Sequence, residues 1–241
     1  MFEPVKAGLG EFLQAFYGEV VPTTKPLQEF VERGFPYCMA WAPTRMVDKA
    51  EEMLAAYQRN DTRQGPTRPP SLPVVLVGVA KDWTPAEKSF TTQISDAVDI
   101  TFPEDPKKRY FRVRTVAGEI RAQLAFFASD EPTAKSLAAQ FLLFLDSPSR
   151  RRFPASYPFA GLEHEYPAQI EAPDNPAMNV ETSNKNLTIL AVDVVLKVTV
   201  PLFMSPKPGE ANDGQGVPGT DDPAGYPLVQ QVDEYPEEPT A

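Results

Sequence analysis

The sequence predicts an α+β fold in which a mixed or antiparallel β-sheet is flanked by two or three helices and followed by a disordered C-terminal tail. Apolar and polar side chains alternate over 109–128 and again over 192–202, as is typical of long strands with one buried face. Apolar stripes at helical spacing occur elsewhere in the chain. Because these patterns stop after Phe203, we expect a single α+β domain over 1–203 and a tail over 204–241.

The first part of the chain carries two helical patterns. Apolar residues at helical spacing predict a helix over 4–17, and a second stripe predicts another over 45–58, which Thr44 can cap. Residues 19–35 fit no single period and leave an extended conformation open. The short aromatic run 35–42 is interrupted by a proline, so we interpret it as an edge or terminal strand.

The middle of the chain predicts a strand, a long excursion and the best-marked helix. A β-rich apolar run over 72–80 predicts a buried strand. Residues 81–108 show no sustained period, and loops of this length usually bind something or pack on a neighbour. After the strand at 109–128, Ser129 or Asp130 can cap a helix that carries an apolar stripe to about Leu145.

The last part of the predicted domain begins with a basic, aromatic loop over 147–161. A strand over 162–171 and a polar, turn-rich segment over 172–187 follow it. The alternating stretch over 192–202 then predicts a long terminal strand that closes the sheet.

Charge is unevenly distributed along the chain, whose formal net charge is −10. The 38 residues of the tail contain seven prolines, five glycines, eight acidic residues and one basic residue, which gives a net charge of −7 and leaves −3 for residues 1–203. A nearly neutral body is not suited to holding nucleic acid by net charge, so we expect no sequence-specific nucleic-acid binding. The tail has too few apolar residues to offset the entropy of ordering it.

Composition also bears on compartment and covalent structure. The chain has one cysteine, Cys38, so no intrachain disulfide can form. No apolar run approaches the roughly 18 residues of a membrane helix, and the N-terminal residues lack the features of a signal peptide. We therefore expect synthesis in the cytoplasm and no membrane partner.

Motifs of chemistry are scarce. The single histidine, His164, lies between two glutamates, where it is either a paired general base or, as we favour, a surface strand histidine beside carboxylates. Cys38 is interpreted as a packing residue, and a zinc site would need mostly carboxylate ligands. The sequence has no phosphate-binding loop, dinucleotide turn or nucleophile elbow. We accordingly predict no catalytic, cofactor-binding or metal-binding residue and no cofactor.

Two groups of arginines lie among aromatic residues. The group at 150–152 could be a solvated loop, a nucleic-acid contact, or a surface that meets carboxylates on a partner protein, and we favour the last. The group at 107–114 could be a strand with one charged face or another docking surface. The candidate protein-interface residues are Arg109, Arg112, Arg114, Arg150, Arg151, Arg152, Phe153 and Tyr157.

The order of the predicted elements over roughly residues 36–205 resembles the tail terminator, or tail sheath-completion (neck), proteins of contractile-tailed bacteriophages. Three stretches carry the resemblance: the strand LPVVLVGVA, the strand and capped helix IRAQLAFFASDEPTAKSLAAQFLLFL, and the late strand LTILAVDVVLKVTVPLF. The chain departs from the family in the 81–108 excursion and in its first 35 residues, which do not align.

The resemblance implies a non-enzymatic virion structural protein of the head–tail joining region. It would form a homo-oligomeric ring, usually a hexamer, that caps the tail tube and sheath and meets the head-to-tail connector, after assembly in the host cytoplasm. Two alternatives stay open. One is another phage neck or baseplate subunit, and the other is a monomeric small-molecule-binding domain or carboxylate-based enzyme.

Overall fold

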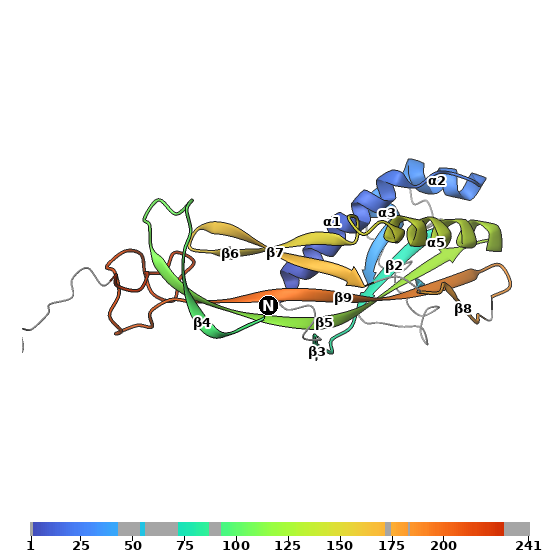
Figure 1. The fold of residues 1–241 in the computed structure, drawn as a ribbon. Helices are drawn as coiled ribbons and strands as arrows, with labels where there is room; N and C mark the ends of the chain where they lie inside the picture. Colours follow the sequence, from blue (N-terminus) through green and yellow to red (C-terminus); the bar gives the residue numbers. More distant parts are fainter. Residues whose placement is uncertain are drawn as a thin grey trace, which may run out of the picture. The chain divides into compact units, whose positions relative to one another are not determined.

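The computed structural model describes residues 2–42, 54–55, 72–86, 93–171, 175–182 and 184–228 of the 241-residue chain. The fold is α+β, as predicted, with a mixed sheet and helices (Figure 1). The chain divides into two compact units, which are described separately. Unit 1 comprises residues 1–92, 117–156 and 165–200, and unit 2 comprises residues 93–116, 157–164 and 201–241.

Unit 1 contains the main sheet, in the strand order β1-β2-β5-β9-β7-β6. The strands of the sheet are β1 (Met39–Ala42), β2 (Val74–Val79), β5 (Tyr110–Ala128), β6 (Arg152–Phe159), β7 (Leu162–Glu171) and β9 (Thr188–Met204). The short strands β3 (Thr84–Pro85) and β8 (Met178–Val180) pair with β5 and β9. β1 is parallel to β2, whereas β2 is antiparallel to β5 and β7 is antiparallel to β9. β5, β6, β7 and β9 each contribute residues to both units.

The helices of unit 1 lie on one side of this sheet (Figure 1). They are α1 (Glu3–Glu19), α2 (Lys25–Arg33), α3 (Phe35–Cys38) and α5 (Glu131–Asp146). The ring of Phe141 on α5 lies 5.2 Å from Phe16 of α1 and 5.7 Å from Phe126 of β5. The aromatic stripes of two helices and one face of the sheet therefore form one core.

The opposite face of the sheet is also covered over part of its area. A second buried cluster includes Leu76 of β2, Phe127 of β5 and Ile189 of β9, together with Leu54 and Leu187. Both faces of β2 and of the end of β5 are therefore buried, which explains why these strands are apolar almost continuously.

Local signals account for the helix ends. The Asp130 side chain accepts a hydrogen bond of 2.8 Å from the backbone N–H of Thr133, so the predicted cap of α5 is confirmed. Thr24 caps α2 in the same way at 3.3 Å, and a proline occupies the first turn. No helix of the described part of the chain is both long and apolar enough to cross a membrane.

Unit 2 has its own small core. β4 (Ile94–Thr101) is antiparallel to the first part of β5. The ring of Phe159 stacks on Phe203 at 4.6 Å and meets Phe111 at 4.9 Å, while the ring centroids of Phe102 and His164 are 3.9 Å apart. These aromatic rings give the unit buried area that its short strands alone do not provide.

Most of the predicted regular elements are present. The helix expected over 4–17 is α1, and the strands expected over 72–80, 109–128 and 162–171 are β2, β5 and β7. The terminal strand expected over 192–202 is β9. The helix expected over 45–58 lies outside the described residues apart from residues 54 and 55, which are helical.

The N-terminal and middle regions differ from the expectations in three places. Residues 19–35 contain the helix α2, whose nine residues bury only Leu27 and Phe30 and so carry a weak periodic signal. The edge strand expected over 35–42 is confirmed over Met39–Ala42 as β1, whereas Phe35–Cys38 form a helical turn, α3. The 81–108 excursion contains β3 and β4, and β4 has too few buried positions to show a clear alternation.

The expected loop over 147–161 is also wrong, because β6 occupies most of it in a tight hairpin with β7. The alternation of β6 was hidden by its prolines and small residues. The predicted start of the tail at Met204 is too early. Residues 204–228 form part of unit 2, and the tail predicted beyond them, over 229–241, lies outside the described residues.

Candidate interaction surfaces

Arg109 is the centre of a buried ion-pair network in unit 2. Arg109 is 2% exposed, and Asp105 is 1% exposed. The guanidinium donates from Nε and Nη2 to the two oxygens of Asp105, both at 2.9 Å. It also donates to the Asp222 carboxylate at 2.5 Å and to the backbone carbonyl oxygens of Pro223 at 2.8 Å and Ala160 at 3.0 Å. Arg109 therefore joins three segments that are distant in sequence.

Electrostatics explains how this network tolerates burial. The hydrogen bonds that Arg109 donates to Asp105 raise the pKa of Arg109 and outweigh the effect of desolvation. Burial alone would raise the pKa of Asp105, but hydrogen bonds from Arg109 and from backbone N–H groups lower it below its ordinary value. Hydrogen bonds from Lys107 and Arg109 lower the pKa of Asp222. All three groups are therefore charged at neutral pH.

The same network fixes residues 222–226 against β5. The backbone N–H of Tyr226 donates to the carbonyl oxygen of Tyr110 at 2.7 Å. At Gly225 a Cβ atom would lie 2.7 Å from that oxygen and 3.0 Å from the Arg109 Cβ, so only glycine allows this close approach. Ion pairs, a backbone bridge and a close glycine contact thus order a segment whose composition predicts disorder.

The prediction that Arg109 lies on a docking surface is wrong, because its donors are used inside the subunit. Phe153 and Tyr157 are each 7% exposed, so their rings are packing residues of the subunit and not exposed anchors. In unit 2, Arg112 and Arg114 are exposed on β5. Arg112 pairs with Asp99 at 3.1 Å and lies over the Tyr226 ring at 4.5 Å.

The second arginine group belongs to unit 1. Arg150 and Arg152 are exposed, and Arg151 is half-buried. Arg150 pairs with Glu19 at 2.6 Å and lies over the Phe144 ring at 5.0 Å. The two predicted groups are therefore parts of different units, and their role as protein interfaces stays a prediction.

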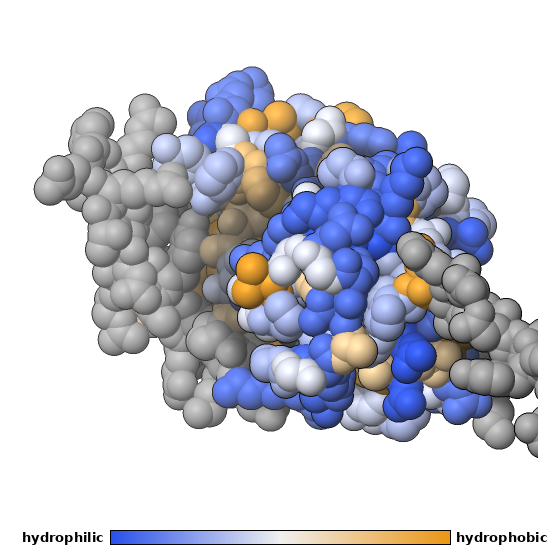
Figure 2. All heavy atoms as spheres, turned by 90° about the vertical axis from the view of Figure 1, so that its left-hand side faces the viewer, coloured by the Kyte–Doolittle hydropathy of each residue, from blue (hydrophilic) through white to orange (hydrophobic). Residues whose placement is uncertain are grey.

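Figure 2 looks onto the side of Figure 1 at which β4 and the C-terminal segment are drawn. Where described residues are visible, this face is mostly hydrophilic, and its hydrophobic residues lie in small separate groups. Val98 of β4 is one exposed apolar residue of unit 2. This face accordingly presents hydrophilic side chains and no continuous apolar patch among the described residues that are visible.

His164 and Cys38 have structural surroundings. His164 lies in the aromatic core of unit 2, with Nε2 3.1 Å from the carbonyl oxygen of Phe159. Cys38 is fully buried, and its thiol donates to the Phe30 carbonyl oxygen at 2.9 Å. Burial raises the pKa of the Cys38 thiol to about 11, so the reactive thiolate is scarce at neutral pH. Cys38 is a packing residue, as favoured from the sequence. His164 is half-buried against the Phe102 and Phe203 rings, whereas a surface position on a strand was expected.

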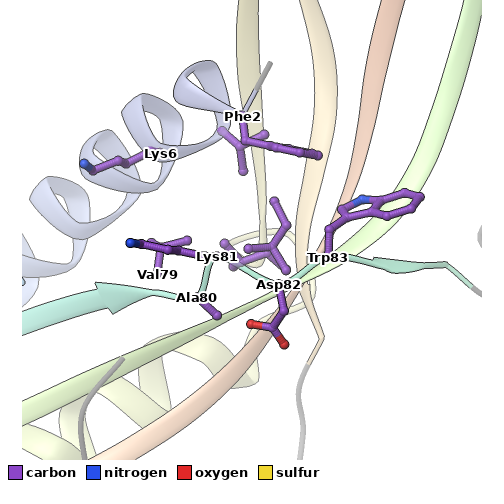
Figure 3. A pocket seen from close by; sticks show the side chains of 10 residues that line it. Phe2, Lys6, Val79, Ala80, Lys81, Asp82 and Trp83 are labelled. Atoms are coloured by element: carbon purple, nitrogen blue, oxygen red, sulfur yellow. The ribbon is translucent and has the colours of Figure 1, made fainter. Parts of the chain in front are cut away.

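Unit 1 contains a small apolar pocket that the sequence did not reveal (Figure 3). Its volume is about 60 Å³, and it is lined by Phe2, Val5, Lys6, Val79, Ala80, Lys81, Asp82, Trp83, Ile120 and Leu196. Drug-sized ligands usually need cavities of about 300 Å³ or more, so this pocket suits a single side chain better than a whole ligand.

Two tryptophans border this pocket region. Trp83 lines the pocket and is 36% exposed, and a Cβ at Gly118 would come within 1.7 Å of its indole nitrogen. The ring therefore rests directly on the β5 backbone at Gly118. Trp41 is 41% exposed, and Lys6 Nζ lies 5.1 Å from the centroid of its ring. We call Lys6, Trp41, Lys81 and Trp83 the tryptophan–lysine surface.

Sequence reasoning missed this surface because its residues come from α1, β1 and the segment after β2. Only the pairing of β1 with β2 and of β3 with β5 brings them to one unit. One signal was present: both tryptophans of the chain lie in short polar or edge segments and not in the strongest apolar runs. No protein-family model matches the chain, and no curated protein matches it either.

Proposed function

We propose that this chain is a structural assembly subunit of a contractile bacteriophage tail, namely a tail terminator or neck subunit that forms a ring. The ring would be hexameric, cap the tail tube and sheath, and join them to the head-to-tail connector in the virion. The role would be structural and not catalytic. The order of β2, β5, α5 and β9 supports the proposal, since it is the order on which the resemblance rests.

The observation that carries the proposal is the group of exposed aromatic side chains at one edge of the unit 1 sheet. Tyr37 of α3 is 51% exposed and Trp41 of β1 is 41% exposed. β1 is the last strand of the sheet on this side and pairs only with β2 among the described residues. Aromatic side chains are enriched in protein interfaces, and an open strand edge invites a partner. A subunit that contacts copies of itself needs such a surface.

The lengths of β5 and β9 also support a role in assembly. β5 has 19 residues and β9 has 17, about three times the usual strand length of five or six residues. Strands of this length link both units through continuous backbone. Such a subunit can transmit contacts along a long sheet, which suits a part that joins two larger structures.

The oligomeric state tests this proposal. We expect mass photometry and electron microscopy to show closed rings, either of the purified chain or after addition of the tail-tube protein encoded in the same genome. Trp41→Ser should reduce the ring fraction strongly. Leu143→Ser should not, because this exposed residue lies on α5 and leaves the β1 edge unchanged. A chain that stays monomeric in both conditions would refute the proposal.

A further inference from the structure

The tryptophan–lysine surface of unit 1 has the chemistry to receive an acidic, aromatic peptide segment. Figure 3 shows the amino groups of Lys6 and Lys81 on the same side of the pocket. The Trp83 ring lies on the opposite side, and the Asp82 carboxylate points away from both amino groups. The surface therefore presents an apolar hollow with two cations at one end and an aromatic ring at the other.

We propose that this surface docks residues 229–241 of a neighbouring copy of the chain. The segment reads VQQVDEYPEEPTA, in which Tyr235 stands between two acidic pairs, Asp233–Glu234 and Glu237–Glu238. The segment has four acidic residues and no basic residue. The proposal rests on the proposed assembly function, because it requires two copies in contact.

The pocket and its two lysines match the size of the Tyr235 side chain and the charge of the acidic residues beside it. A pocket of about 60 Å³ holds the equivalent of about four water molecules, which suits one inserted side chain. The Tyr235 ring is the largest side chain of the segment. With the ring in the pocket, its flanking carboxylates come beside Lys6 and Lys81, where ion pairs favour one orientation.

The prolines of the segment fit the two exposed indole rings. Pro236 directly follows Tyr235, and Pro239 follows the second acidic pair. Proline-containing segments commonly dock on aromatic-lined surfaces, because the restricted proline backbone loses little entropy on binding. Trp41 and Trp83 supply such rings at the surface.

The network around Arg109 anchors the residues that precede this segment in the chain. Asp222, Pro223 and Tyr226 are fixed to unit 2 by the contacts described above. A segment that leaves an anchored point acts as a tethered ligand within an assembly, with an effective concentration that can reach the millimolar range. Two different surfaces of one chain that complement each other form a head-to-tail contact, and such contacts generate rings when the rotation closes.

Zero-length carbodiimide cross-linking of the full chain tests the docking. A mixture of ¹⁵N-labelled and unlabelled chains shows by mass spectrometry whether each cross-link joins two copies. We expect cross-links between copies from Lys6 or Lys81 to Asp233, Glu234, Glu237 or Glu238. The pair Lys107–Asp222, at 2.5 Å within one chain, is the internal positive control.

Two matched glycine substitutions distinguish docking in the pocket from non-specific electrostatic attraction between the lysines and the acidic segment. Gly118→Ala forces the Trp83 ring to move, whereas at Gly10 a new Cβ would be 3.6 Å from Trp41, an ordinary contact. We expect Gly118→Ala and Tyr235→Ala to lower the yield of these cross-links about two- to tenfold, as for loss of one aromatic contact, and Gly10→Ala to leave it unchanged. The Lys107–Asp222 cross-link reports in each variant whether unit 2 is intact.

Mass photometry of the same samples distinguishes the two proposals. Oligomers with the expected cross-links support both. Oligomers without them, or oligomers in which Gly118→Ala and Tyr235→Ala give the same cross-link yield as the wild type, overturn the docking and leave the assembly function standing. Cross-links only within one chain overturn docking between copies. A monomer without cross-links between copies, with or without the tail-tube protein, overturns both.

Discussion

Replacing Arg109 by methionine should destabilise the protein, because it leaves the buried Asp105 carboxylate without its charged partner. Asp105 is 1% exposed and accepts from Nε and Nη2 of Arg109 at 2.9 Å. Removing one member of a buried ion pair costs about 3–5 kcal/mol of the free energy of unfolding. Asp105 keeps hydrogen bonds from the backbone N–H groups of Arg109 at 2.9 Å and Lys107 at 3.2 Å. The expected loss is therefore near the lower value, about 3 kcal/mol.

Urea-induced unfolding at neutral pH measures this loss. The control is Arg114→Met, on the same strand and exposed, which should change the free energy of unfolding by no more than about 0.5 kcal/mol. Hydrogen exchange adds a local readout, since the backbone N–H of Tyr226 should lose protection only in the Arg109 variant. Equal stabilities for the two variants would refute the reasoning.

A double substitution separates the contribution of the ion pair to the free energy of unfolding from the contribution of packing. In Arg109→Met/Asp105→Leu neither charge remains, so the free energy of unfolding should recover in part. Recovery should be incomplete, because the carbonyl oxygens of Ala160 and Pro223 also lose their donor. A coupling energy between the two sites of about 0.5–3 kcal/mol is expected for residues in one network. Additive losses would mean that the two side chains do not interact in solution.

Three further predictions follow from described contacts. Truncation after Ser205 removes the Asp222 and Tyr226 contacts and should lower the Tm by more than about 5 °C, whereas truncation after Leu228 keeps them and should change it little; equal Tm values would contradict the attachment of 206–228. Phe141→Ala should cost about 3–5 kcal/mol in urea unfolding, against less than about 0.5 kcal/mol for the exposed Leu143→Ala, and similar losses would show that the buried face of α5 is misassigned. Because the folded state lowers the pKa of Asp105, its contribution is complete above the unfolded pKa of about 3.9 and is lost as pH falls through the lower folded value. As the pH is lowered through about 4, the urea concentration at the unfolding midpoint should therefore decrease more steeply for the wild type than for Asp105→Asn. Parallel pH profiles of the two proteins would rule this out.

The regular elements were largely predictable, because each carries its own periodic signal. β5 and β9 were visible from alternation, and α5 was visible from its apolar stripe and the Asp130 cap. The elements that were not predicted share a physical cause. α2, β4 and β6 are short or weakly buried, so their patterns lack enough apolar positions to stand out.

The candidate surfaces were predictable only in part. Arginines beside aromatic residues were a real signal, yet the sequence could not separate exposed Arg112 from buried Arg109, three positions earlier. Burial of Arg109 depends on Asp105, Ala160 and Asp222, which the fold brings together from distant positions. The tryptophan–lysine surface had no local pattern, since pairing between strands creates it.

The sequence by itself determined the α+β class, the long strands, the cap of α5 and the change in composition after Phe203, because each depends on side-chain spacing or local composition. Only the tertiary structure decided that residues 204–228 are ordered. Residues 204–228 lack apolar residues for a core of their own, but Arg109 supplies a buried cation that Asp222 and the Pro223 carbonyl oxygen satisfy. A long-range ion pair in a protected site outweighs the local preference for disorder, and no local pattern encodes such a contact.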